Sequence, residues 1–440
     1  MDKISKKNVF FVGLMIFSMF FGAGNLIFPP FLGQMAGRNT IPAYLGFIVS
    51  AVGLPVLSVI VVSKSNGLNA LASHVHPMFA LIFTILIYLS IGPFLAIPRT
   101  ATVSYEMGAL PFLPKSMTNG AAPLFIYTII YFLITLWLSL TPLKLVDRLG
   151  KILTPILLIL IIIVFAAGIF KPMGSFQVPR GDYKIFPFFK GFSEGYLTMD
   201  AIAGLNFGIV ICTTLKSMGV KKEKSIVTYT TEIGAVVGVL LASIYAMLSY
   251  LGASSAVISK NAQNGAEILT SISLFLFGKF GVIIMGIIFT LACLTTAVGL
   301  ITSCSEYFAS LTNKISYKSW AFILSAASMI FSNAGLTKIL EISVPVLDAI
   351  YPMAIVLMLL FMFNRLFKDS KHVYRMCMLF TAIFSITDAV NVSFFKVKAV
   401  SSIFSSIPFY SVGLGWIIPA LLGILLGCIF SAIDSSKKEC

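Results

Sequence analysis

The chain has 440 residues, of which 58% are hydrophobic and 11% are charged, and its mean hydropathy is +0.99. Average soluble chains carry about 25% charged residues, so this composition excludes a soluble globular protein. The net charge of +15 is spread over short segments between apolar runs, which indicates membrane topology rather than a nucleic-acid partner. We expect an all-α polytopic membrane protein in contact with the lipid bilayer.

Apolar runs long enough to cross a bilayer recur along the whole chain. The first follows a short basic head and has no small-residue cleavage site behind it, so we interpret it as a span and not as a signal peptide. We predict twelve transmembrane helices, at 9–36, 41–63, 78–105, 122–141, 146–170, 191–215, 226–251, 279–311, 317–333, 344–364, 373–391 and 412–433.

The distribution of basic residues predicts the orientation of these spans. With the N-terminus in the cytoplasm, 19 of the 31 Lys and Arg residues fall in cytoplasmic segments and 11 in outer segments. Cytoplasmic loops of membrane proteins carry an excess of basic residues. An even number of spans with both termini in the cytoplasm is therefore expected.

The first span contains a stretch that a continuous helix does not accommodate. Pro29 and Pro30 lack the N–H groups that would bond the carbonyls of Asn25 and Leu26. Gly22 and Gly24 let the backbone leave helical geometry. We predict two half-helices, 9–20 and 26–36, with Asn25 as the N-cap of the second and an unwound joint at mid-membrane. Unpaired backbone in lipid costs several kcal/mol per group, which favours a binding site over a simple kink. The stretch reads Phe20-Phe21-Gly22-Ala23-Gly24-Asn25-Leu26-Ile27-Phe28-Pro29-Pro30.

The sixth span, 191–215, has a similar interruption, with Asp200, Gly204, Asn206 and Gly208 in its middle. Broken helices at spans one and six are separated by five spans, so the second unit enters the membrane from the opposite side. Paired broken helices in matching positions are typical of transporters with inverted repeats. We predict a single transporter domain, 1–440, with repeats 9–170 and 191–364 and two further helices in 373–433.

The broken helices predict what the site binds. Free N–H groups at the start of the second half-helix suit a carboxylate, and free carbonyls at the end of the first suit a cation. Carbonyls of an unwound 200–204 segment suit an ammonium, so a zwitterionic amino acid needs no charged side chain here. Asp200 has three possible roles (binding the ammonium, holding a cation, carrying a proton) or else bonds the unwound backbone. The predicted substrate-binding residues are Phe21, Gly22, Ala23, Gly24, Asn25, Leu26, Asp200, Ala201, Ala203 and Gly204.

The stretch from Phe20 to Pro30 resembles the first-helix signature of the bacterial branched-chain amino acid carriers (system II, the leucine/isoleucine/valine:cation symporter family). Chain length and helix layout are similar from end to end. The resemblance implies a LeuT-like fold of 5+5 inverted repeats plus two C-terminal helices. It also implies uptake of leucine, isoleucine and valine across the bacterial cytoplasmic (inner) membrane by alternating access.

A second motif concerns the coupling ion. The eighth span contains Ala292-Cys-Leu-Thr-Thr-Ala297, with adjacent hydroxyls at Thr295 and Thr296. The motif resembles the shared sodium site of LeuT-like transporters, which implies sodium ligation by both threonines and by the carbonyls of Ser18 and Phe21. Alternatively, the threonines bond carbonyls of their own helix.

The remaining features narrow the function. Arg99 and Glu106 lie two turns apart on one helix, where they line the outer vestibule or form a structural pair. Segment 254–278 predicts an outer loop helix at Glu267–Phe277. The sequence has neither metal-site spacing nor a phosphate-binding loop, so we expect no enzyme, no cofactor other than the coupling ion and no obligate protein partner. Proton-coupled symport through Asp200 and exchange of neutral amino acids stay open as alternatives on the same fold.

Overall fold

The computed structural model describes residues 4–114, 120–260, 262–312, 314–367 and 369–439. These residues form helices and connecting segments, and no strand occurs among them. The chain divides into two compact units. Unit 1 comprises Met1–Ile60 and Ile91–Ile339, and unit 2 comprises Val61–Ser90 and Leu340–Cys440.

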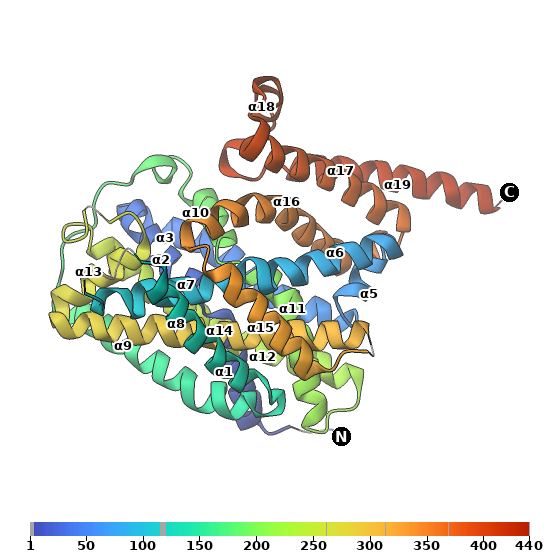
Figure 1. The fold of residues 1–440 in the computed structure, drawn as a ribbon. Coiled ribbons are helices and arrows are strands. Elements are labelled where there is room, and N and C mark those ends of the chain that lie inside the picture. Colours follow the sequence, from blue (N-terminus) through green and yellow to red (C-terminus); the bar gives the residue numbers. More distant parts are fainter. Residues whose placement is uncertain (1–3, 115–119, 261, 313, 368, 440) are drawn as a thin grey trace. The chain divides into compact units, whose positions relative to one another are not determined.

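The α-helices within unit 1 are labelled in Figure 1. They are α1 (Lys6–Phe20), α2 (Ala23–Ala36), α3 (Thr40–Ile48), α7 (Ala96–Gly108), α8 (Ala121–Ser139), α9 (Thr154–Phe170), α10 (Pro187–Tyr196), α11 (Asp200–Ser217), α12 (Glu223–Ser254), α13 (Gly265–Phe277), α14 (Lys279–Leu311) and α15 (Tyr317–Ser332). Short 3-10 and π segments join them: η1 (Gly37–Asn39), η2 (Val49–Gly53), η4 (Leu110–Phe112), η5 (Pro142–Lys144), η6 (Val146–Leu153) and η7 (Gly181–Lys184).

Unit 2 contains α5 (Leu68–Ser73), α6 (Pro77–Leu89), η8 (Asn364–Phe367), α17 (Lys371–Val390), η9 (Asn391–Phe395), α18 (Lys398–Ser405), η10 (Tyr410–Val412) and α19 (Ile417–Glu439). Three elements continue across the division of the chain, namely α4 (Leu54–Lys64), η3 (Ser90–Phe94) and α16 (Leu336–Met362).

The helices support a polytopic membrane protein. Within the described part of the chain, nine helices are long and apolar enough to cross a membrane, or up to ten if the bent pair α10 and α11 is one span. Helices α1 and α15, with 15 and 16 residues, are too short to be counted among them. The number of twelve spans therefore stays a prediction, although the predicted 279–311 has the bounds of α14.

The first interruption is shorter than the sequence predicts. Helix α1 ends at Phe20 and α2 begins at Ala23, so the prediction that α2 begins at Leu26 with Asn25 as its N-cap is wrong. Gly22, which is extended, occupies the N-cap position. The Asn25 side chain points back, and its Oδ1 accepts the Gly22 N–H at 3.0 Å. The two prolines lie inside α2 without ending it.

The second interruption precedes the residues predicted to be unwound. Helices α10 and α11 are bent by 45° at a break between Tyr196 and Asp200. Residues 200–204 are helical, because Asp200 suits the positive N-terminal end of α11. Gly204 is needed for packing, since a Cβ there would lie 1.8 Å from Ser58 Oγ. The break is made by Met199, which has φ = +68°.

Glycines bring the second half of one broken helix and the first half of the other close to a neighbouring helix. Gly33 and Gly252 join α2 to α12, and Gly46 and Gly191 join α3 to α10. A Cβ on any of the four would lie 1.9 Å from a carbonyl oxygen of the facing helix. Small residues allow this close backbone approach, which is typical of helix pairs in membranes.

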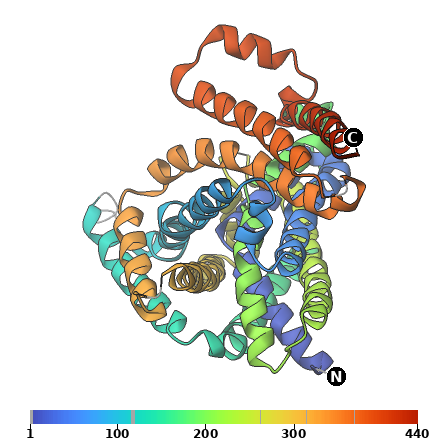
Figure 2. The ribbon, with the colours of Figure 1, turned by 90° about the vertical axis from the view of Figure 1, so that its right-hand side faces the viewer.

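Helix α14 lies within unit 1, where α1, α7, α8, α11 and α15 all pack against it. Figure 2 shows it nearly end-on among its neighbours. Most of its residues from Gly281 to Phe308 are buried. The predicted ion ligands Thr295 and Thr296 lie in the middle of α14, so the packing of this helix determines their position within unit 1.

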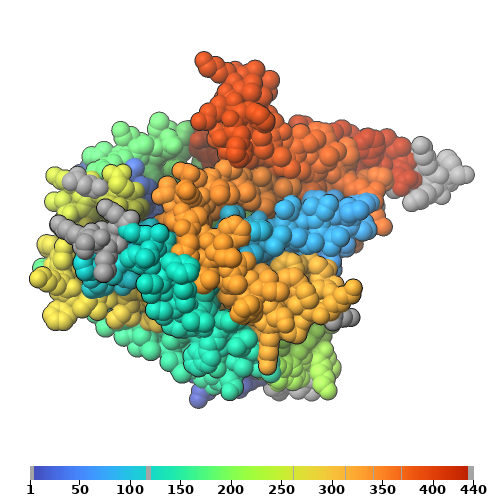
Figure 3. Space-filling model, in the orientation of Figure 1, coloured from blue at the N-terminus to red at the C-terminus, as the bar shows by residue number. Residues whose placement is uncertain are grey.

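In unit 2, α17 and α19 form an antiparallel hairpin with α18 between them in sequence. Gly423 and Gly427 allow the contact, because a Cβ on either would lie 2.5 Å from the Cα of Cys377 or Val373. Figure 3 shows the surface of α18 projecting from this hairpin.

Candidate functional site

The two interruptions of unit 1 lie at one cavity. It has room for about 20 Å³, which is close to the space of one water molecule. Residues of α2, α7, α11 and α14 contribute to its wall. The polar residues that line it include Asn25, Arg99, Thr100, Thr198, Asp200 and Thr296. We refer to it as the joint cavity.

A hydrogen-bond network ties the two interruptions together. Asn25 Nδ2 donates to Asp200 Oδ2 at 2.5 Å and also to the Tyr245 hydroxyl. The Tyr245 hydroxyl in turn donates to Asp200 Oδ2 at 3.0 Å. All three side chains are at least 98% buried. Because a carboxylate offers about four acceptor sites, Asp200 keeps capacity to accept a ligand's ammonium.

The backbone beside this network is strained. Met199 is the N-cap of α11 and has the left-handed conformation, which is uncommon for a residue with a side chain. It is 4% exposed and lines the joint cavity. Such a conformation costs about 1–3 kcal/mol and occurs preferentially at functional sites. The second interruption therefore combines a strained residue with a position in the cavity wall.

The cavity is lined by one arginine and one aspartate, a combination that the interpretation of the sequence did not require. Arg99, on the first turn of α7, is 9% exposed, and Asp200 is 2% exposed. The guanidinium is near enough to Asp200 for a Coulombic attraction. Glu106, considered as a partner for Arg99, lines a different cavity.

The predicted substrate-binding residues separate into two groups. Gly22, Ala23, Gly24, Asn25, Asp200 and Ala203 line the joint cavity. Phe21, Leu26, Ala201 and Gly204 are buried without lining it. Phe21 instead stacks on Phe17, with ring centroids 5.2 Å apart. It also lies against Tyr245, at 6.3 Å.

Two of the four predicted ion ligands, the Ser18 carbonyl and the Thr296 hydroxyl, meet where α1 ends against α14. The Ser18 carbonyl would normally accept the Gly22 N–H, but Asn25 Oδ1 takes that N–H instead. Thr296 Oγ1 donates to the Ser18 carbonyl at 3.4 Å. This brings one predicted carbonyl and one predicted hydroxyl together.

Thr295 behaves as the alternative interpretation expected. Its hydroxyl donates to the carbonyls of Leu291 and Ala292 in its own helix, at 3.0 and 3.1 Å. A hydroxyl that donates its proton still has lone pairs with which to ligate a cation. Among the described residues, no group of three or more His, Cys, Asp or Glu side chains could hold a metal ion.

Tyr245 and Thr198 are not among the site residues predicted from the sequence. Tyr245 is one hydroxyl on the long apolar helix α12, and Thr198 lies just before Asp200. The Thr198 hydroxyl accepts the Asp200 N–H at 3.4 Å. The signal that could identify such residues is a polar group in the middle of a span. The partner that gives the group a role, however, lies in a distant part of the chain.

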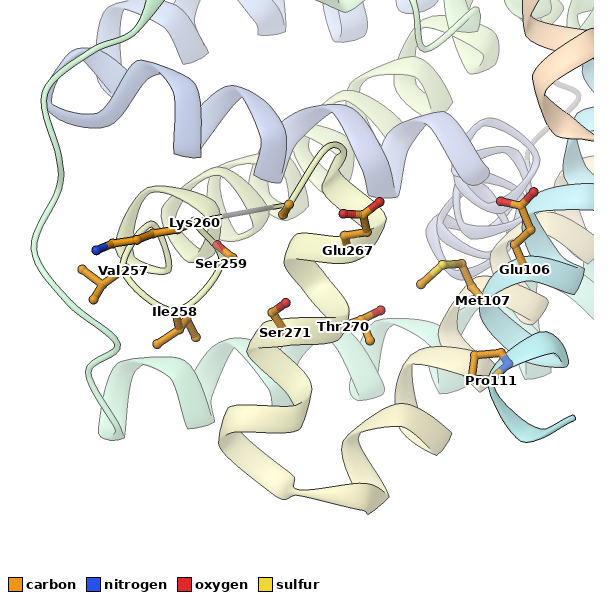
Figure 4. A pocket seen from close by; sticks show the side chains of 11 residues that line it. Glu106, Met107, Pro111, Val257, Ile258, Ser259, Lys260, Glu267, Thr270 and Ser271 are labelled. Carbon is orange, nitrogen blue, oxygen red and sulfur yellow. The ribbon is translucent and has the colours of Figure 1, made fainter. Parts of the chain in front are cut away.

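A second, larger cavity lies between α7 and α13, with room for about 630 Å³. Figure 4 shows Glu106 and Met107 of α7 on one side and Glu267, Thr270 and Ser271 of α13 on another. The predicted loop helix Glu267–Phe277 is confirmed as α13, whose N-terminus Asn264 caps by accepting the Glu267 N–H at 3.0 Å.

The loop between α12 and α13, which lines this α7–α13 cavity, is bound to α2. Gln34 Nε2, on α2, donates to the carbonyl of Ser259 at 2.8 Å and to its hydroxyl at 2.7 Å. Gly265 also packs closely, since a Cβ there would lie 1.7 Å from the Ile27 carbonyl oxygen. The wall of the α7–α13 cavity is therefore held against α2 by both contacts.

Comparison with known proteins gives a consistent result. The family model described as "Branched-chain amino acid transport protein" matches residues 5–434. The chain is 45% identical over 434 residues to the branched-chain amino acid permease BrnQ of Bacillus subtilis, covering 98% of both chains. It is 39% identical over 430 residues to the branched-chain amino acid transport system 2 carrier protein of Pseudomonas aeruginosa, covering 97% of each.

Solved structures with the same fold are much more distant in sequence. Mhp1, a nucleobase-cation-symport-1 family transporter, superposes with a TM-score of 0.63 at 12% identity, covering 98% of this chain and 93% of Mhp1. MhsT, in complex with L-phenylalanine, superposes with a TM-score of 0.56 at 15% identity, covering 94% and 98%. These similarities show the fold, which is LeuT-like as expected.

Proposed function

Because the chain belongs to the branched-chain amino acid transport protein family, we propose that it takes up leucine, isoleucine and valine by sodium symport. Membership makes it a multi-pass membrane transporter and not an enzyme. The proposal places it in the bacterial cytoplasmic membrane with both termini in the cytoplasm, as the distribution of basic residues favours.

The observation that carries the proposal is the charge arrangement of the joint cavity. An amino acid has a carboxylate and an ammonium, and the cavity has Arg99 and Asp200 in its wall. Met19, Phe20, Ile91 and Leu300 line it too and provide an apolar surface for an aliphatic side chain. A zwitterion with a hydrocarbon side chain matches all three features.

Sodium coupling is supported by the Ser18 carbonyl. Asn25 removes its usual donor, which leaves an oxygen at the end of α1 beside the Thr296 hydroxyl. Oxygen ligands without a formal charge suit a monovalent hard cation. In the proposed site, Ser18 and Phe21 contribute carbonyls and Thr295 and Thr296 contribute hydroxyls.

The size of the joint cavity supports alternating access as the transport mechanism. A space of about 20 Å³ is too small for leucine, since ligand sites are typically of about 300–1,000 Å³. Substrate entry therefore requires the helices around the interruptions to move apart. We take the α7–α13 cavity, whose loop is attached to α2, as the outer approach to the site.

The inverted repeat, 9–170 against 191–364, is part of the proposal. In such a repeat α1 corresponds to α10, α2 corresponds to α11, and α12 corresponds to the span that α3 and η2 begin. Both halves of the first broken helix pack on α12, and both halves of the second pack on the span of α3 and η2, which is the exchange of partners that the repeat implies. The interruptions would then lie at matching depths near the middle of the membrane.

Proton coupling is the second candidate, and the burial of Asp200 favours it. This carboxylate, 2% exposed, is held by Asn25 and Tyr245 at the centre of the proposed site. Buried carboxylates in membrane spans are used as proton carriers.

Radiolabelled leucine uptake into proteoliposomes tests the proposal. The purified protein is given an inward sodium gradient, an inward proton gradient, or neither. Accumulation with sodium alone supports sodium symport, and accumulation with protons alone replaces it by the proton-coupled candidate. If neither gradient drives accumulation by intact protein, exchange against preloaded leucine is the remaining mechanism to measure.

A further inference from the structure

Asn206, in the middle of α11, has a side chain for which the proposed site gives no role. It is 0% exposed, and among the described residues neither its amide oxygen nor its amide nitrogen has a hydrogen-bond partner. Burial of an amide without partners is costly, and most buried polar side chains in proteins are bonded. An unpaired amide in a membrane helix is therefore expected to gain its partners in another state of the transporter.

Asn206 lies at an interface of α11 with α14 that contains further polar groups. The Ser303 hydroxyl donates to the Asn206 carbonyl at 2.9 Å, and the Thr213 hydroxyl donates to Glu306 Oε2 at 3.3 Å. Asn206 and Thr213 are seven residues apart in α11, so their side chains lie on one face of the helix, the face that Glu306 contacts. We refer to these four residues as the α11–α14 seam.

The α11–α14 seam continues from the joint cavity along both helices. Asp200 and Thr296 line the cavity, and the seam residues follow them in the same direction along α11 and α14. At about 1.5 Å per residue, Glu306 lies about 15 Å beyond Thr296 along α14. Both helices are followed by segments with several lysines, 216–224 and 314–318, which the positive-inside rule predicts to be cytoplasmic.

Met19 separates the α11–α14 seam from the joint cavity in this structure. It lines the cavity from α1, and its Cγ lies 2.6 Å from the position that a Cβ on Gly299 would occupy. Gly299 lies between Thr296 and Ser303 on α14. Because Met19 is 0% exposed and packed this closely, a ligand in the joint cavity reaches the seam only when α1 moves away from α14.

The chemistry of the α11–α14 seam suits a cation. The amide oxygen of Asn206 and the hydroxyl oxygen of Ser303 have lone pairs for a cation, and the amide N–H can donate to a water that the cation brings. Glu306 is half-buried near the end of α14, where its carboxyl group favours a cation that has left the neutral ligands. None of the four seam residues is basic, so the seam does not match the carboxylate of an amino acid.

We propose that the α11–α14 seam is an inner site for the coupling cation, which Asn206 and Ser303 ligate after it leaves Thr296 and which Glu306 draws toward the cytoplasm. This inference rests on the proposed function and goes further, because it assigns a second ion site and a route of release. In the structure described here the seam is closed and the amide is unpaired. The cost of that unpaired amide favours opening of the seam.

The experiment measures the sodium requirement from each side of the membrane. Leucine uptake into right-side-out membrane vesicles gives the external sodium concentration for half-maximal transport. Efflux of preloaded radiolabelled leucine into sodium-free buffer gives the internal value. We expect Asn206→Leu to raise the internal value about tenfold and the external value less than about threefold. Glu306→Gln, which keeps the size of the side chain, should raise the internal value by a smaller factor.

Asn391→Leu is the matched control for the unpaired amide. Asn391 is 4% exposed, but its Nδ2 donates to the Ser401 hydroxyl at 3.0 Å and its Oδ1 accepts the Val397 N–H at 2.8 Å. Loss of these bonds should lower the Tm of the purified protein, whereas Asn206→Leu should not lower it. An equal decrease of the Tm in both variants would contradict the unpaired amide and with it the inference.

The comparison of the two sides separates an inner site from a general defect. Thr296→Ala should raise both sodium values, because it acts at the proposed central ion site. An internal value that is unchanged in Asn206→Leu, or raised equally with the external value, would overturn the inference. If Asn206→Leu does not fold, Ser303→Ala replaces it: a selective rise of the internal value supports the inner site, and no rise contradicts it. Failure of sodium to drive uptake by the wild type would instead count against the proposed function, and the Tm comparison would still test the amide.

Discussion

The two interruptions of unit 1 are built in different ways. At Phe21–Gly22 the chain uses an extended glycine, and Asn25 takes over one backbone donor. At Leu197–Met199 the chain uses a methionine in the left-handed conformation followed by a carboxylate. The first interruption supplies backbone donors and carbonyls, whereas the second supplies a buried carboxyl side chain. A site for a zwitterion and a cation needs both.

The comparison also shows how the two interruptions depend on each other. The Asn25 side chain closes the turn at the first and donates to Asp200 at the second. A change at one is therefore expected to reach the other through a single side chain. The following predictions test this division of roles, in order of decreasing effect.

Gly24→Leu should abolish leucine uptake, a loss of more than about 100-fold. A Cβ added at this position would lie 3.2 Å from both Arg99 Nη2 and Thr198 Cα. The introduced leucine side chain would also fill the joint cavity. Uptake per amount of inserted protein is the measurement. Gly53→Ala is the glycine control, since its Cβ meets nothing closer than 3.8 Å, and it should transport normally. Normal uptake by Gly24→Leu would remove α2 from the site.

Asp200→Asn should raise the leucine KM about 10- to 100-fold, because a hydrogen bond to a charged group contributes about 1.5–3 kcal/mol. The amide keeps the size of the side chain, so the expected loss comes from the charge. Leucine uptake under a sodium gradient is the assay. An unchanged KM would contradict ammonium binding at Asp200, and sodium-driven accumulation that persists would exclude Asp200 as an essential proton carrier.

Thr296→Ala should raise the sodium concentration for half-maximal uptake about tenfold, a change of about 1.4 kcal/mol. The substitution removes the hydroxyl beside the Ser18 carbonyl without touching either interruption's backbone. Thr296→Ser, which keeps the hydroxyl, is the control and should resemble the wild type. Sodium dependence that is identical in all three proteins would argue against an ion site at Thr296.

Tyr245→Phe should raise the leucine KM about three- to tenfold, since a hydrogen bond contributes about 1 kcal/mol net. The ring, which contacts Phe47 and Phe21, is retained, and only the hydroxyl between Asn25 and Asp200 is lost. Tyr250→Phe, on the same helix but 39% exposed, should have no effect. Equal KM values for the two variants would mean that the hydroxyl does not position Asp200.

The sequence located the first interruption to within three residues because glycines and prolines are strong local signals. It misplaced the second because Asp200 and Gly204 looked like breakers, although one begins α11 and the other packs on Ser58. Nothing local marks Met199, whose conformation depends on tertiary contacts. The threonine pair was recognised from a motif, and the structure brings Thr296 to Ser18 but keeps the Thr295 hydroxyl within its own helix.

The position of Arg99 depends on tertiary structure more than the positions of the two interruptions do. Its distance from Gly24 arises from the kink at Gly92 and from the packing of α7, and no periodicity in the sequence encodes it. The same holds for Tyr245, since its two partners are 220 and 45 residues away in the chain. Local patterns found the broken helices, and long-range packing determined which side chains they bring together.

The most direct test of the account is leucine binding to the purified protein as sodium is raised at constant ionic strength. If the ion and the amino acid occupy adjacent parts of one site, each increases the affinity for the other. The account predicts that the leucine Kd of the wild type falls as sodium rises and that Thr296→Ala largely removes this dependence. A leucine Kd that does not change with sodium in the wild type would contradict it.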